Sequence, residues 1–405
     1  MTQKAVLVGA LDTKGAEFDF VKQALESLGV ETFVIDMGVL GTPFFTPDIS
    51  SAEVAERGGM SLAELQKQND RGKAISVMMD GVSSIMADLL EQDRIGAVYG
   101  MGGTAGTTIG AAAMREVPIG IPKLLVSTVA SGNTRPYVGE KDIMMMYSVV
   151  DIAGINKLSR RILRNAAYAL AGMIQEISRE QDDETEKPML GATMFGVTTP
   201  CVTRVRELLE EQGYDVLVFH ATGAGGMAME ELIRAGFIKG VADITTTELA
   251  DELVGGVFSA GPNRLEAAGA AGIPQVVSVG ALDMVNFGPP ETVPQQFKDR
   301  TFYIHNPTTT LMRTTLSENS ELGRRIALKL NASQAGTIVI FPQGGVSMLD
   351  RTGQAFDGVE ERKALLKGIK EHLREDIPLI ETEENINDPA VAALIAERLL
   401  VMMNK

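Results

Sequence analysis

The chain of 405 residues has only one cysteine, Cys201, and no tryptophan. One cysteine cannot form a disulfide within the chain, so we expect a fold held by its core in a reducing compartment, the cytoplasm. Structural zinc is not expected, because clustered cysteines and CxxC pairs are missing. No run of about 18 apolar residues occurs, so no membrane partner is expected.

Positive charge and several catalytic motifs are also scarce. Lys and Arg number 37 against 53 Asp and Glu, a formal net charge of −16 that disfavours sequence-independent binding of nucleic acid. The P-loop pattern GxxxxGK[ST], a serine nucleophile elbow and an HExxH metal motif are missing. These absences argue against Walker-type NTPases, serine hydrolases of the elbow type and zinc metalloproteases.

The sequence instead alternates apolar runs, glycine turns and segments with helical spacing. Residues 4–38 and 189–223 share the order apolar run, turn, amphipathic segment, glycine, apolar run, which is typical of one βαβ unit. We therefore predict an α/β fold of two doubly wound, Rossmann-like lobes with mainly parallel sheets. Common ancestry of the halves and a merely shared α/β pattern explain this similarity equally well.

A charged segment separates the predicted lobes. The stretch "SREQDDETEKP", residues 178–188, lacks apolar periodicity and ends in proline, which is typical of a solvated linker. It gives an N-terminal lobe at 1–180 and a C-terminal lobe at 188–405. The segment from Asp388, with proline in its first turn, predicts a closing helix.

The strongest functional signal is the glycine-rich stretch "YGMGGTAGTTIGAAAM", residues 99–114. Its "GMGGTA" fits GxGxxG/A, a pattern that lets backbone amides approach phosphates at a helix N-terminus. The next apolar run, "KLLVS", ends at Ser127 where a dinucleotide-binding unit has an acidic residue, so NAD is disfavoured. This stretch has two interpretations. It either binds phosphate, through Gly102, Gly103, Thr104 and Ala105, or it is only a crowded turn between a strand and a helix. On the first, Gly102→Val should abolish binding and leave the fold intact.

Further polar loops follow the neighbouring apolar runs, and in a parallel sheet such loops gather at one edge. "ALDTKG" places Leu11, Asp12 and Thr13 together, where Asp12 either meets Mg²⁺ and phosphate or caps a helix. Asp36 ends the second run and suits a ribose hydroxyl, although strand-end Asp residues also cap turns.

Two loops add cations and amides. "QNDRGKA" sets Gly72 between Arg71 and Lys73, which either meet a polyphosphate or form a solvated charge pair. "VASGNTRP" is a polar loop without an apolar anchor, and its candidate ligand-binding residues are Ser131, Gly132 and Asn133.

Taken together, these motifs resemble a known family. "VLVGALDTKGAEF", "VIDMGVLGTP", "GMGGTAGT", "SGNTRPYVGEKD", "HATGAGGMAME" and "FPQGGVSMLD" are similar to the ATP-binding N-terminal domain of the tomato mosaic virus resistance protein and its bacterial relatives. The resemblance implies two α/β lobes, ATP on the N-terminal lobe and a homodimer. The plant protein carries a further domain after this region, so activity that depends on that domain is not implied.

The resemblance also implies which residues contact the nucleotide. They are Leu11, Asp12, Thr13, Thr42, Thr46, Gly72, Lys73, Gly102, Gly103, Thr104, Ala105 and the loop around Gly132.

The second half offers a possible second pocket. His220 ends an apolar run, and Glu248 starts a predicted helix, where its charge would favour the helix dipole without a ligand. Asn263 and Arg264 lie at the start of another predicted helix, where they either bind an anion or have only a structural role. Asp283 and His305 complete the candidates for general acid–base chemistry, if they converge.

Three functions remain open from these residues. The first is an ATP-binding protein, with Mg²⁺, that transfers a phosphoryl group to a small polar substrate between the lobes or in the second one. The second is a non-catalytic, ATP-responsive protein-interaction module. The third is a lyase or hydrolase confined to the C-terminal lobe.

Overall fold

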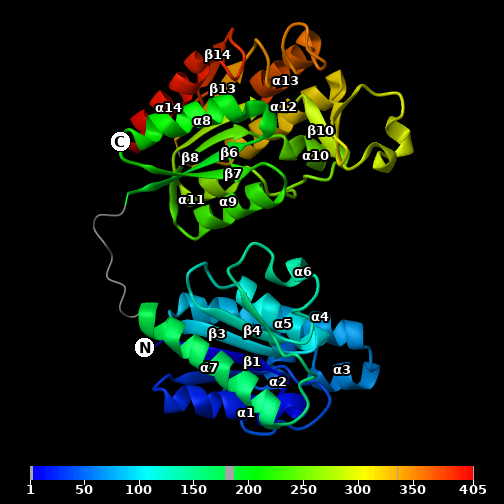
Figure 1. Cartoon of the computed structure of the whole chain (residues 1–405), viewed down its shortest axis with the longest axis vertical. Helices are drawn as coiled ribbons and strands as arrows, with labels where there is room; N and C mark the ends of the chain where they lie inside the picture. Colours follow the sequence, from blue (N-terminus) through cyan, green and yellow to red (C-terminus); the bar gives the residue numbers. More distant parts are fainter. Residues whose placement is uncertain (1–2, 178–186, 335, 405) are drawn as a thin grey trace. The chain divides into compact units, whose positions relative to one another are not determined.

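The computed structural model describes residues 3–177, 187–334 and 336–404. The chain divides into two compact units, residues 1–183 and 184–405 (Figure 1). Of the expected linker 178–188, residues 178–186 lie outside the described part of the chain. Each unit is an α/β lobe and is described by itself.

The first lobe is built on a five-stranded parallel sheet in the order β2-β1-β3-β4-β5. Its strands are β1 (Lys4–Gly9), β2 (Thr32–Asp36), β3 (Ile95–Gly102), β4 (Lys123–Ser127) and β5 (Met144–Tyr147). The chain moves from β1 outward to β2 and then returns to β3 on the other side of β1. The strand order therefore reverses between β1 and β3, which is the flavodoxin type of doubly wound sheet.

Helices cover both faces of this sheet because its central strands are apolar on both sides. On one face, α1 (Leu11–Ser27) and α7 (Lys157–Ile177) pack against side chains such as Leu7 and Tyr99. On the other, Val8 and Val98 contribute to a core with α2 (Ser51–Arg57), α3 (Leu62–Gln68), α4 (Arg71–Glu91) and α5 (Thr104–Arg115). The short α6 (Arg135–Val138) lies between β4 and β5 along the chain.

The second lobe repeats this plan with a six-stranded parallel sheet in the order β14-β13-β9-β8-β6-β7. Its strands are β6 (Met189–Met194), β7 (Asp215–His220), β8 (Ile238–Thr245), β9 (Gln275–Gly280), β13 (Thr337–Pro342) and β14 (Leu379–Thr382). The order reverses between β6 and β8, as it does between β1 and β3. An antiparallel sheet, β10-β12-β11, is added by β10 (Met284–Phe287), β11 (Phe302–Asn306) and β12 (Thr309–Arg313).

Helices again form the outer layers. The helices α8 (Thr199–Glu210) and α14 (Pro389–Met403) lie side by side on one face, over Leu190 and Ile340 (Figure 1). The other face carries α9 (Ala224–Arg234), α10 (Glu248–Val254), α11 (Ala267–Ala271), α12 (Leu316–Asn331) and α13 (Val359–His372). Short 3-10 turns are η1 (Gly196–Thr198), η2 (Pro290–Thr292) and η3 (Gln295–Phe297).

The predicted fold class, two doubly wound lobes with mainly parallel sheets, is confirmed. The predicted closing helix is confirmed as α14, where Asp388 caps the N-terminus by accepting the Ala390 amide at 2.9 Å. None of the helices in the described parts of the chain combines the length and apolar character needed to span a bilayer.

Candidate functional site

A cavity of about 570 Å³ opens in the first lobe at the carboxyl ends of β1, β2 and β3. This is the edge where the strand order reverses, the place at which open α/β sheets bind their ligands. The turns after the three strands supply residues 10, 12–14, 37–40 and 101–106, and further wall residues come from α3, α4, α5 and Asp151. A cavity of this size accommodates a small molecule with several functional groups.

The start of α5 presents unused backbone amides to this cavity. Gly103 is the N-cap of α5, and no side chain caps the helix. Gly103, Thr104, Ala105 and Gly106 all line the cavity. The first N–H groups of a helix have no partner within it, and the helix dipole makes this end positive. The N–H groups of this turn can therefore donate hydrogen bonds to anionic oxygen atoms.

Gly102 explains how β3 can enter α5 without a connecting loop. A Cβ on Gly102 would lie 2.9 Å from the Cα of Gly106, closer than such atoms approach, so only glycine allows the strand end to pack on the first helical turn. The expectation that Gly102→Val would leave the fold intact is therefore wrong. Gly103 has more room, since its nearest neighbour would be the Thr128 hydroxyl at 3.7 Å.

Asp12 organises the opposite side of the cavity. Its Oδ2 accepts the amides of Leu40 at 2.7 Å and Gly41 at 3.1 Å, which fixes the loop after β2. Its Oδ1 is buried and has no hydrogen-bond partner among the described residues. The neighbouring Lys14 also lines the cavity and donates to the backbone carbonyl of Ile152. Asp12 thus fixes the loop after β2 with one carboxylate oxygen, and the other oxygen is closed off from solvent.

Asp36 does not sit where a ribose contact would require it. Its side chain is 1% exposed, and Oδ1 accepts the amides of Leu11 at 3.0 Å and Gly38 at 2.9 Å. Burial raises its pKa above the ordinary aspartate value, against the lowering effect of these two hydrogen bonds. Asp36 holds the turns after β1 and β2 together, and Leu11 beside it is buried in the core.

The helix α4 turns a different face to the cavity from the one expected. Arg71, Ala74, Ile75 and Met78 line it, at the spacing i, i+3, i+4, i+7 that marks one side of a helix. Gly72 and Lys73 lie outside the lining and are exposed. Arg71 therefore takes the position expected of Lys73.

Several other expected contacts lie away from the cavity wall. Thr42 and Thr46 are exposed on the loop after β2, and Ser131, Gly132 and Asn133 are exposed on the loop after β4. Thr107 is buried, and its hydroxyl is 2.6 Å from that of Ser127. Of the expected set, Asp12, Thr13, Gly102, Gly103, Thr104 and Ala105 meet at the cavity.

Sequence reasoning did not assign Leu65, Asn69, Met78 and Asp151 to the cavity. The helical spacing from Arg71 identifies Met78, once α4 is known to face the site. Asp151 has no such signal, because it comes from the segment after β5 that returns across the sheet edge to Lys14. Only the fold brings it to this position.

In the second lobe, the expected anion site at Arg264 is filled by the chain itself. Arg264 is 1% exposed and donates to Asp243 at 2.5 and 2.6 Å and to Glu248 at 2.7 Å, with Glu230 at 3.4 Å. Glu248 in turn accepts the amides of Gly223 and Gly226, and burial raises its pKa while Arg264 lowers it. The guanidinium has no room for an external anion, which corrects the expectation for Arg264 and Glu248.

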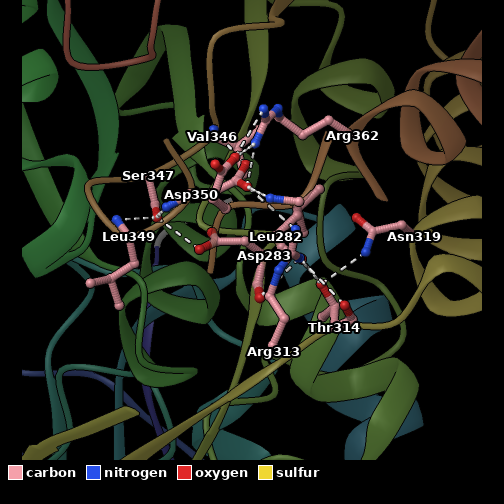
Figure 2. Close-up of polar contacts among 12 residues, drawn as sticks. Leu282, Asp283, Arg313, Thr314, Asn319, Val346, Ser347, Leu349, Asp350 and Arg362 are labelled. Atoms are coloured by element: carbon pink, nitrogen blue, oxygen red, sulfur yellow. Dashed lines mark hydrogen bonds and ion pairs between the residues drawn. The ribbon is translucent and has the colours of Figure 1, made fainter. Parts of the chain in front are cut away.

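Asp283 belongs to a second buried cluster (Figure 2). The Ser347 hydroxyl donates to Asp283 at 2.8 Å, and Asp350 lies between Arg362 at 2.6 Å and Arg313 at 3.3 Å. Burial and the nearby Asp350 carboxylate raise the pKa of Asp283, against the opposing effect of Arg313. These bonds join β12 to the loops after β9 and β13, so the cluster stabilises the lobe.

The remaining polar candidates of the second lobe do not join this cluster. His220 is exposed at the end of β7, with its ring 5.6 Å from that of Phe195, and His305 is exposed on β11. Asn263 is exposed beside Arg264. Within the described residues, no hydrogen bond or ion pair links either histidine to Asp283, so the proposed acid–base group is not assembled there.

The fold and the cavity define a two-lobed α/β protein with a cavity at the reversal point of its first sheet. Residues 3–179 match the N-terminal domain, and residues 187–403 the C-terminal domain, of the uncharacterised protein family UPF0261. The chain belongs to this family.

Its relatives include bacterial and plant proteins. The UPF0261 protein of Clostridium tetani is 55% identical over 406 residues, and the matched region covers 100% of both proteins. The ToMV resistance protein Tm-1(GCR237) of Solanum lycopersicum is 47% identical over 303 residues, which are 74% of this chain and 40% of the tomato protein.

Among solved structures, the chain is similar to a UDP-GlcNAc 2-epimerase of Methanocaldococcus jannaschii in complex with UDP-GlcNAc and UDP. The matched region covers 100% of this chain and 93% of the epimerase chain. The identity is 10% and the TM-score is 0.24. Similarity this low carries no argument about the ligand.

Proposed function

We propose that the first lobe binds ATP and holds its phosphates on the main-chain amides at the start of α5. The observation that carries the proposal is the uncapped N-terminus of this 12-residue helix, which opens into the cavity at the reversal point of the sheet. A triphosphate supplies both the negative charge and the acceptor atoms that this end of a helix lacks. The resemblance to the tomato protein's ATP-binding domain points to the same nucleotide.

Mg²⁺ is expected to arrive with the nucleotide and to meet Asp12. Mg²⁺ is usually held by one or two carboxylates together with substrate phosphates, and Oδ1 of Asp12, which has no partner among the described residues, would take this role once the buried carboxylate turns it toward the cavity. Since Oδ2 of the same carboxylate holds Leu40 and Gly41, Asp12 would connect the metal to the loop after β2.

The amide cradle can be tested with one position and two substitutions. Thr104 is the first residue of α5, where proline fits the helix but lacks an N–H. Thr104→Pro and Thr104→Ala both lose the hydroxyl, and only the first loses the amide donor. We expect ATP to bind roughly 10-fold more weakly to Thr104→Pro than to Thr104→Ala, because a hydrogen bond to a charged group contributes about 1.5 kcal/mol or more.

Isothermal titration calorimetry of the full chain with ATP and Mg²⁺ gives this comparison. Equal affinity of the two variants would contradict the placement of phosphate on α5. Failure of the unsubstituted chain to bind ATP, with or without Mg²⁺, would remove the proposal altogether.

The contact between a cationic side chain and the phosphates can be tested with a matched pair of substitutions. Arg71 and Lys73 start the same helix, but only Arg71 lines the cavity. Arg71→Met and Lys73→Met change the net charge equally, and we expect only Arg71→Met to weaken ATP binding, by roughly 10-fold. A larger loss in Lys73→Met would favour the residue that the sequence suggested.

The proposal concerns binding, because the geometry adds no support for phosphoryl transfer. Glu248 and Arg264 are bound to each other, and the second lobe's histidines are not linked to Asp283. From the family resemblance we further propose a homodimer, which sedimentation equilibrium would test. Release of ADP from ATP in the presence of a small polar acceptor would add catalysis to binding.

A further inference from the structure

We propose that the nucleobase of the bound nucleotide lies in an apolar chamber at the inner end of the same cavity, held by contact with methionine side chains. The methionine chamber is formed by Met37, Leu65, Met78 and Ile109, which line the cavity and belong to one apolar cluster. This inference rests on the proposed function, and it assigns the part of the ligand that the phosphate cradle leaves unexplained.

The chamber is apolar on several sides. Met37 follows β2 and Met78 belongs to α4, so two separate elements supply methionines to one apolar cluster, whereas Met101 of β3 packs with Tyr99 on the other face of the sheet. The exposed fractions of Met37 and Met78 are 4% and 0%, although both line the cavity. They therefore form an enclosed wall and not part of the outer surface.

Such a wall does not suit an ion that consists of phosphate alone. Inorganic tripolyphosphate would occupy the α5 amides and leave the methionine chamber in contact with water, whereas a nucleotide would bury a flat ring there. Methionine suits this task because its flexible thioether follows irregular shapes and makes favourable contacts with aromatic rings.

The polar side chains near the chamber are largely engaged elsewhere. Asp70 accepts the Lys73 amide at 3.1 Å as the cap of α4, and Asp12 holds the loop after β2 with one of its oxygens. Lys14 donates to the Ile152 carbonyl. The inner wall thus offers the ring van der Waals contact, which is why we assign recognition to the methionines.

The chamber borders the phosphate cradle directly. A Cβ on Gly106, in the first turn of α5, would lie 3.8 Å from the terminal methyl carbon of Met37. On α4, Arg71 and Met78 lie on the same helical face with Ala74 between them. One ligand can therefore contact the amides and Arg71 with its phosphates and the methionines with its ring.

A bulky residue at Ala74 would fill the chamber and leave the cradle unchanged. We expect Ala74→Phe to weaken ATP binding by roughly 100-fold and to leave the affinity for tripolyphosphate unchanged, because only the ring is displaced. Ala87→Phe is the matched control, since Ala87 is exposed on the same helix and does not line the cavity. ATP that binds Ala74→Phe as tightly as the unsubstituted chain would overturn the proposal.

A second measurement needs no substitution in the site. With the methionine methyl groups labelled with carbon-13, ATP should shift the resonances of Met37 and Met78 through the ring current of the base, and tripolyphosphate should not. Single Met→Leu variants assign these signals, and the buried Met86 of α4, which lies outside the cavity, serves as the unshifted reference.

The outcomes separate the two proposals. If ATP binds but shifts these two methyl groups no more than tripolyphosphate does, the base lies elsewhere, so the chamber is wrong and ATP binding stands. If neither ATP nor tripolyphosphate binds, the proposed function is wrong and the assignment of the base falls with it.

Discussion

Asp251 offers a prediction about pH because it is a buried carboxyl group that forms no ion pair with any cation of the described residues. Burial raises its pKa to about 7 from the ordinary 3.8, in spite of hydrogen bonds from the amides of Phe258 and Asn286, both at 3.1 Å. The Asn286 side-chain amide lies 2.7 Å from its Oδ2, and the nearby Glu248 raises the pKa further. The folded second lobe should therefore hold a proton on Asp251 at pH 5.

The sign of the pH dependence follows from this shift. Between about pH 4 and pH 7 the folded state keeps a proton that the unfolded state has lost, so the free energy of unfolding falls as the pH rises. Each pKa unit corresponds to about 1.4 kcal/mol, so the shift from 3.8 to about 7 amounts to at most about 4 kcal/mol. Below pH 4 both states are protonated and this penalty is absent.

The perturbation is Asp251→Asn, which cannot ionise. Its carbonyl oxygen can still accept the main-chain amides of Phe258 and Asn286. Its NH₂ group takes the place of Oδ2, which now accepts Nδ2 of Asn286, so the Asn286 side-chain amide has to turn over and present Oδ1 as the acceptor. We expect a variant about as stable as the unsubstituted chain at pH 5 and more stable at pH 8, by up to about 4 kcal/mol.

Cys201 reports the unfolding of the second lobe alone. It is the only cysteine, it is buried, and burial raises the pKa of its thiol to about 12, so the folded lobe should not react. Reaction with 4,4′-dithiodipyridine in a urea series at pH 5 to 8 gives the free energy of unfolding at each pH. The reasoning is refuted if Asp251→Asn and the unsubstituted chain lose stability in parallel as the pH rises. Asp388→Asn at the exposed cap of α14 is the control.

Four further substitutions test the backbone and core of the first lobe. Tyr99→Phe removes a buried hydroxyl for which the described part of the chain provides no hydrogen-bond partner, so thermal unfolding should show unchanged or increased stability, by about 1 kcal/mol at most. Val149→Gly should add about 1 kcal/mol in a urea titration, because Val149 has a φ of 65° that a β-branched residue adopts only under strain. Gly102→Val should lower the melting temperature, since its side chain would collide with the backbone of Gly106, whereas Gly103→Ala should not.

Much of the first lobe could be predicted because its signals are local. Apolar runs bounded by glycine and polar residues predict β3 and β4, and the glycine pattern predicts the turn into α5. The gathering of Asp12 and Thr104 at one cavity follows from a general property of parallel sheets, whose carboxyl ends meet at one edge. Local signals of this kind do not say which way a side chain points, and so the sequence offered Arg71 and Lys73 alike and the resemblance named Lys73, whereas α4 presents Arg71 to the cavity.

The second lobe was harder to interpret because its polar residues are buried. An arginine before a helix is equally consistent with an anion site and with an internal ion pair, and the partners of Arg264 lie 16 to 34 positions away along the chain. Asp283 meets Ser347 across 64 positions (Figure 2). Such pairings depend on which strands become neighbours, and a single sequence does not give them.

The two lobes differ in what lies at the positive N-terminal end of a helix that follows a strand of the sheet. In the second lobe, the amides of Gly223 and Gly226 at the start of α9 donate to the Glu248 carboxylate at 2.8 and 3.0 Å, and Arg264 holds that carboxylate in place. A negative group of the chain thus occupies the positive end of the helix. In the first lobe no side chain takes this position at α5, and a cavity lies there instead. The first lobe is therefore the one in which an anionic ligand would complete the fold's own hydrogen bonding.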